Sequence, residues 1–174
     1  MTAVLTVDVV GTPAPQGSKR AFQHRTTGRV VVVESNNAKN KSWRQDVKAA
    51  ALNVIAEHAT EPFTGPLAVT IAFRLPRPGY HYGTGRNANT LKPGAPDYVE
   101  KKPDLDKLVR STLDALGEAG VWRDDAQVAG LQLVKQYATH EPPGAHIEIS
   151  SLNSVPAAGS SPVPSAGTVQ EALL

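Results

Sequence analysis

The sequence contains no cysteine. This absence excludes a disulfide framework, a zinc site built from thiolates and a cysteine nucleophile. A metal ion can therefore be held only by oxygen or imidazole ligands. The histidines show no spacing typical of metal ligands, so no function is assigned to them.

Long apolar runs are also missing. No stretch approaches the roughly 20 apolar residues that cross a membrane, and the N-terminal segment has no basic region followed by an apolar run. We expect a soluble, cytoplasmic protein with no membrane partner. A chain of 174 residues, 40% of them hydrophobic, predicts one domain with one core.

The charges are distributed unevenly along the chain. Residues 1–102 contain 14 Lys and Arg against 7 Asp and Glu, whereas residues 103–174 contain 4 against 9. A basic surface beside an acidic spot suits a polyanion that is held near a metal site. Ordinary surface charge with a chance imbalance is the alternative interpretation.

Residue patterns predict most of the secondary structure. Alternating apolar residues predict strands over 4–10 and 67–75, and a β-branched run over 29–34 predicts the second arm of a hairpin. Apolar spacings of three and four predict a helix starting at an N-cap, Ser42, and a second helix over about 104–116. Further strands are expected over 128–137 and 146–152.

Two segments lack an apolar period. Residues 79–102 form a long basic loop, and loops of that length in compact domains are usually functional or disordered. Residues 153–174 are rich in Pro, Ser, Ala and Gly, which predicts a disordered tail after a folded domain over 1–152.

Acidic residues gather around the second predicted helix. Asp104 and Asp106 straddle its start, and Asp124 and Asp125 follow a turn that contains glycines. The plain interpretation of the first pair is helix capping. If a short return brings the second pair back to the helix start, the carboxylates form an oxygen site suited to Mg²⁺ or Mn²⁺. Such a site can activate water and orient a phosphodiester.

Arg110 lies one turn after Asp106 on the same edge of this helix. Its spacing allows an ion pair with Asp106, or a contact with a phosphate group.

The same segment resembles the signature of the RusA Holliday junction resolvases. The resemblance rests on Lys102-Pro103-Asp104-Leu105-Asp106, on Asp114-Ala115-Leu116, and on Gly120-Val121-Trp122-Arg123-Asp124-Asp125-Ala126-Gln127-Val128. It implies an α+β fold, with a small mixed sheet packed against two main helices in a two-layer domain. It also implies a homodimer that uses Mg²⁺ to make paired nicks in a four-way DNA junction.

The resemblance assigns roles to individual residues. The catalytic, metal-binding aspartates of the family fall on Asp104, Asp106 and Asp125, and its catalytic lysine falls on Arg110. Arginine keeps the charge but cannot donate a proton near neutral pH, so phosphate binding is the expected role there. Lys107 stands where family members commonly have Asn.

Other basic residues are candidates for contacts with the DNA backbone, because phosphate binding requires cations. They are Lys19, Arg20, Arg25, Lys101, Lys102 and Lys107. Taken individually, each is better interpreted as a solvated surface charge. Tyr80 and Tyr82 are candidates for stacking on bases, with local packing as the alternative.

Two other classes of protein remain open. A non-catalytic module that binds branched DNA with the same fold is favoured by the arginine at position 110, whereas three intact aspartates argue against it. A nucleotide-sugar glycosyltransferase also uses Asp-x-Asp to hold a divalent ion, but the chain is short and shows no alternating strand and helix order with a nucleotide loop.

Overall fold

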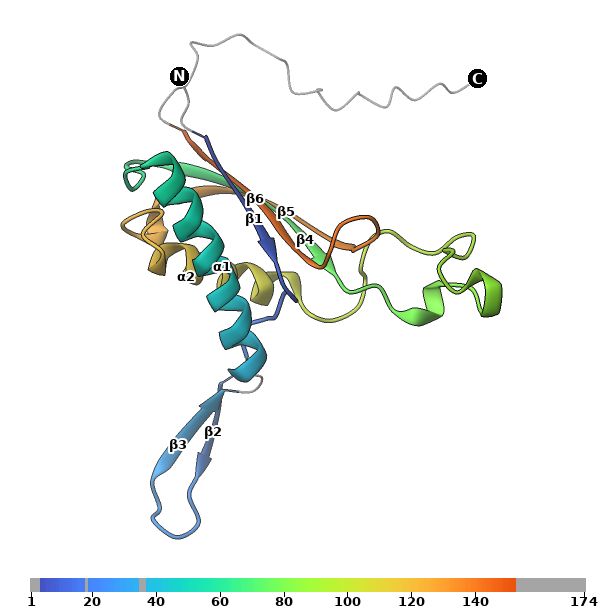
Figure 1. Ribbon diagram of the computed structural model, residues 1–174. Coiled ribbons are helices and arrows are strands. Elements are labelled where there is room, and N and C mark those ends of the chain that lie inside the picture. Colours follow the sequence, from blue (N-terminus) through green and yellow to red (C-terminus); the bar gives the residue numbers. More distant parts are fainter. Residues whose placement is uncertain (1–3, 18, 35–36, 153–174) are drawn as a thin grey trace, which may run out of the picture.

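The protein has the expected α+β architecture, in which one mixed sheet is covered by helices on one face (Figure 1). A computed structural model describes residues 4–17, 19–34 and 37–152. The sheet contains β1 (Val4–Val10), β4 (Leu67–Leu75), β5 (Val128–Tyr137) and β6 (Gly144–Ser151) in the order β1-β6-β4-β5. β6 is antiparallel to β1 and β4, whereas β5 is parallel to β4. No described helix is long and apolar enough to span a membrane.

The core lies between this sheet and the helices. Alternation along the strands turns every second side chain inward, as predicted, because successive strand residues point to opposite faces. Trp43 and Trp122 are both buried in this core. The strands contribute mainly Leu5, Val7, Val9, Leu67, Val69, Ile71, Phe73, Ala145, Ile147 and Ile149.

Helices α1 (Asn37–His58) and α2 (Leu105–Glu118) pack against each other on the inner face of the sheet (Figure 1). The predicted start of α1 at Ser42 was wrong, because the helix begins five residues earlier. The buried Asn40 explains the extension, since its side chain accepts a hydrogen bond from Ser111 in α2. This tertiary contact stabilises a first turn that lacks a strong apolar pattern.

Two segments project from the domain (Figure 1). The predicted hairpin is confirmed, since β2 (Lys19–Gln23) and β3 (Val30–Glu34) pair in antiparallel fashion as a separate sheet. The second projection is the long loop between β4 and α2, which contains the short helices η1 (Gly79–His81) and η2 (Gly85–Asn87). The tail predicted over 153–174 lies outside the described residues.

Gly144 is the position where the sheet tolerates a side chain least. A Cβ atom there would lie 1.8 Å from the carbonyl oxygen of Val9, which is backbone and has no room to move. We expect Gly144→Ala to lower the free energy of unfolding by about 3 kcal/mol, the upper end of overpacking costs. Urea denaturation measures this loss.

Gly130→Ala is the matched control, because a Cβ on this β5 glycine would meet only ordinary contacts with Ala68 at 3.6 Å. Equal stabilities of the two variants would contradict the close approach of β1 and β6 at Gly144.

Candidate active site

The first acidic pair lies at the start of α2, where the chain leaves the long loop. Asp104 is the N-cap residue by its backbone angles, yet its side chain forms no capping hydrogen bond. Its Oδ2 atom is instead 3.1 Å from the Nζ atom of Lys107. Asp106 lies in the first turn and is exposed. Since the carboxylate of Asp104 does not cap the helix, it is available for a ligand.

Lys135 holds the segment that leads into this helix. Its ammonium group donates to the carbonyl oxygen of Lys101 at 2.8 Å and to that of Pro103 at 2.9 Å. No motif in the sequence marks Lys135 as a site residue. One feature of the sequence could have identified it. Lys135 occupies an inward position on β5, two residues after Leu133, in an alternation that is otherwise apolar.

Removing this ammonium group should loosen the loop before α2. We expect Lys135→Met to lower the free energy of unfolding by about 2 kcal/mol, because two carbonyl groups lose a charged donor. Hydrogen exchange at residues 99–104 should accelerate more than exchange in the sheet. Gln132→Met, an exposed position on the opposite face of β5, is the control, and unchanged exchange in Lys135→Met would contradict the bracing role.

The second acidic pair lies at the other end of α2. Asp125 opens the short helix η3 (Asp125–Gln127), and its Oδ1 atom accepts a hydrogen bond of 2.8 Å from the indole of Trp122. A Cβ atom at Gly117, in the last turn of α2, would lie 3.0 Å from the same oxygen. Burial raises the pKa of Asp114, and the neighbouring Asp125 carboxylate raises it further, against the effect of Arg44. These contacts place Asp125 against the end of α2.

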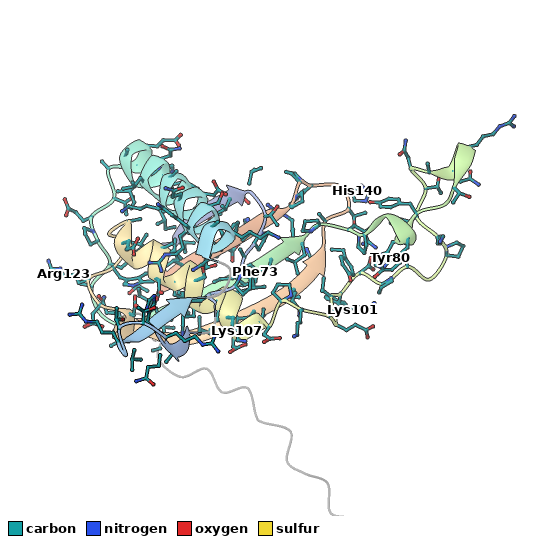
Figure 2. The ribbon with its side chains drawn as sticks, turned by 90° about the horizontal axis from the view of Figure 1, so that it is seen from below. Phe73, Tyr80, Lys101, Lys107, Arg123 and His140 are labelled. Atoms are coloured by element: carbon teal, nitrogen blue, oxygen red, sulfur yellow. The ribbon has the colours of Figure 1, made fainter. Side chains whose placement is uncertain are left out.

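Within one chain, the second acidic pair packs against the far end of α2 instead of returning to the helix start. Eleven residues separate Asp106 from Gly117, which corresponds to about 16 Å along a helix. Figure 2 shows Arg123, just before the acidic pair, on the opposite side of the molecule from Tyr80 and Lys101, with Lys107 between them. Within the described ranges, no group of three or more His, Asp or Glu side chains could hold a metal ion.

The path of the chain explains this separation. After α2, Gly120 adopts a positive φ of 81° and ends the helix, and the carbonyl oxygen of Val121 then accepts a hydrogen bond from the backbone N–H of Phe63. β5 is the strand that runs back beside α2. The residues at the C-terminal end of β5 are therefore the ones that lie near the start of α2. Asp125 precedes β5 and therefore stays at the far end.

Asp124 and Asp125 have different surroundings. The side chain of Asp124 accepts a hydrogen bond of 2.8 Å from the backbone of Ala126, and Gln127 completes a capping box. Asp124 therefore stabilises η3. Asp125 has no capping role, and its Oδ1 atom accepts the hydrogen bond from Trp122.

Arg110 is exposed on α2 and forms no ion pair within 4 Å in the part of the chain that the structure describes. The i,i+4 pair with Asp106 is therefore not formed. Its positive charge acts on the nearby carboxylate of Asp114, whose pKa it lowers, while its exposed guanidinium group can bind an anion from solvent.

A groove of about 1070 Å³ runs past Asp104. We call it the basic groove, because four lysines line it together with a largely apolar wall. It is lined by residues 12–17, Lys39, Ser42, Leu75, Pro76, Pro78, Tyr80, Val99, Lys101, Lys102, Pro103, Asp104, Lys107 and Tyr137.

The predicted DNA-contacting residues divide into two groups. Lys101, Lys102 and Lys107 line the basic groove. Arg25 is exposed in the turn of the β2–β3 hairpin and does not line this groove. The backbones of Lys19 and Arg20 belong to β2, but their side chains lie outside the described part of the structure.

Arg77 anchors the long loop, and no motif in the sequence marks it either. Its side chain is 1% exposed, and it donates to the carbonyl oxygen of Pro96 at 2.9 Å and to the hydroxyl of Thr139 at 2.8 Å. It also lies over the ring of Tyr137. A single arginine thus ties the loop to the residues just after β5.

The fold and this site define a small α+β domain with carboxylates beside a lysine-lined groove. Comparison with protein families matches residues 11–150 to the family described as Endodeoxyribonuclease RusA. The chain therefore belongs to the RusA family of Holliday junction endonucleases. Comparison with curated proteins gave no match.

Proposed function

We propose that this protein is a Mg²⁺-dependent endonuclease that resolves Holliday junctions by paired hydrolysis of phosphodiester bonds. The observation that carries the proposal is the carboxylate of Asp104, which forms no capping hydrogen bond with α2. It lies in a lysine-lined groove, two residues before the exposed Asp106. Lysines attract a polyanion, whereas carboxylates repel one unless a cation lies between them.

The residues at the start of α2 fit a magnesium ion. Mg²⁺ is usually bound through one or two carboxylates, with waters and substrate phosphates as the other ligands. Asp104 and Asp106 offer such a pair, and Mn²⁺ accepts the same oxygen ligands. When bound, the ion would polarise the scissile phosphate and lower the pKa of the attacking water.

The remaining tasks fall to residues of this chain. Lys107 forms an ion pair with Asp104, and a bound metal ion would replace the ammonium group as the partner of that carboxylate. Arg110, whose guanidinium group has no partner within 4 Å among the described residues, would hold the phosphate by bidentate hydrogen bonds. In the reaction, the oxygen of water bonds to phosphorus and the water releases one proton, while the bond from phosphorus to the 3′ oxygen breaks and that oxygen takes up a proton.

We propose that the third aspartate reaches the site from a second copy of the chain. The carboxylate of Asp125 lies beside Gly117, about 16 Å along α2 from Asp106, and within one protomer the described residues bring no three carboxylates together around a metal ion. If two α2 helices lie antiparallel across a two-fold axis, the start of one faces the end of the other. Asp104 and Asp106 would then approach Asp125 of the partner subunit, and the dimer would contain two complete sites.

The surface beside α2 supports this arrangement. β5 is the last strand of the sheet, and within the described part of the chain its outer edge pairs with residues 97–99 alone, near the end of the strand. Leu131 points to the inner face of the sheet but remains about half exposed there. A homodimer along α2 and β5 would cover this leucine and match the two-fold symmetry of a four-way junction.

A cleavage assay tests the proposal. The purified protein is incubated with a synthetic four-way junction, a flap and a linear duplex, each with Mg²⁺ or with EDTA. We expect nicking of the junction in Mg²⁺ alone, and little cleavage of the duplex. Tight junction binding without nicking would support the non-catalytic alternative, which the arginine at position 110 favours.

A further inference from the structure

Tyr80 is an aromatic side chain on the wall of the basic groove that the cleavage chemistry does not use. It comes from η1 in the long loop, and 58% of it is exposed. The same groove contains Asp104. A ligand strand that passes Asp104 would therefore also pass Tyr80.

The ring of Tyr80 is held in place by its neighbours. His81 contacts it edge to face, with ring centroids 4.6 Å apart, and His81 packs in the same way on Tyr137 at 4.8 Å. The ammonium group of Lys92 donates to the carbonyl oxygen of Tyr80 at 2.8 Å. These contacts fix the tyrosine before any ligand binds, so little conformational entropy is lost on binding.

Lys101 adds a positive charge at one end of this ring. Its Nζ atom is 3.4 Å from the hydroxyl oxygen of Tyr80 but 5.6 Å from the ring centroid, so the ammonium group lies near the hydroxyl end. The hydrogen bond with Tyr80 raises the pKa of Lys101, which keeps it charged. Figure 2 shows the two side chains on neighbouring segments of the loop.

We propose that Tyr80 is a stacking platform for an unpaired base of the DNA, with Lys101 binding the adjacent phosphate. An exposed aromatic ring flanked by cations is the usual arrangement for binding single-stranded nucleic acid, because every base has a stacking face. In a linear duplex, the bases are already stacked and paired. Tyr80 would therefore favour branched DNA, where bases at the crossover become accessible. This inference rests on the proposed function.

The test compares DNA binding by three variants in EDTA, where no cleavage occurs. Tyr80→Ala should weaken binding to a four-way junction about tenfold, within the range for loss of one stacked base, and should change duplex binding little. Tyr80→Phe keeps the ring and should bind as the wild type. Tyr98→Ala is the matched control, because Tyr98 is 67% exposed on the same loop but does not line the groove.

Photocrosslinking locates the contact directly. A junction with 5-iodouracil at the crossover should crosslink to Tyr80 in the wild type and lose that crosslink in Tyr80→Ala, while thermal denaturation confirms that the variant is folded. Equal loss of junction and duplex binding, or no loss of either, would overturn the inference. If the wild type cleaves junctions while Tyr80→Ala binds normally, only this inference fails; a wild type that binds no DNA overturns both proposals.

Discussion

Asp106→Asn is expected to reduce junction cleavage at least about 100-fold, since changing even the residues that hydrogen-bond to metal ligands costs about 10- to 100-fold. The substitution removes a negative charge that would hold the metal ion, but the exposed side chain contributes little to folding. Junction binding in EDTA should remain near the wild-type level. Asp104→Asn and Asp125→Asn should behave in the same way. Single-turnover cleavage and fluorescence anisotropy measure the two properties.

Asp124→Asn is the matched control for these variants. Asp124 caps η3 through the backbone of Ala126, and asparagine also accepts such a hydrogen bond. Its cleavage rate should therefore stay close to that of the wild type. Near-normal cleavage by any two of the Asp104, Asp106 and Asp125 variants would refute the assigned site.

Mixing two inactive variants should restore cleavage if each site is shared between two subunits. In a heterodimer of Asp106→Asn and Asp125→Asn, one composite site contains both substitutions and the other contains neither. The intact site should nick one strand of the junction, although each variant alone is inactive. This gain of activity from two inactive proteins is measured on heterodimers purified with two different affinity tags.

The same experiment distinguishes sites shared between two subunits from sites built within one protomer. If each site were built within one protomer, the same heterodimer would have one substitution in each site and would remain inactive. A heterodimer of Asp104→Asn and Asp106→Asn is the control, because both substitutions lie at the same end of α2 and every composite site would be defective.

Local patterns predicted much of the fold. The alternation in β1 and β4 and the apolar stripe of α2 depend on which residues face the core, and these periods are visible in the sequence. The beginning of α1 was not predictable in this way. It depends on Asn40 meeting Ser111, a contact between residues 71 positions apart.

The sequence predicted that Asp104 and Asp106 lie at a helix start, but it did not predict where Asp125 lies relative to them. The spacing of Asp104 and Asp106 identified the helix start, whereas the position of Asp125 depends on β5 pairing in parallel with β4. Lys135 and Arg77 act on the loop through backbone carbonyl groups, which leave no trace in the sequence of the segment that they hold. Tertiary contacts of this kind are set by topology rather than by local propensity.

The most direct test of a paired, metal-dependent resolvase uses a supercoiled plasmid that extrudes a cruciform. Two nicks made in one binding event convert this plasmid directly into a linear molecule, whereas single independent nicks release the supercoils and leave a circle. The proposed function predicts linear product with Mg²⁺ and intact supercoiled plasmid with EDTA. Cleavage that persists in EDTA, or the absence of cleavage with Mg²⁺, would contradict it.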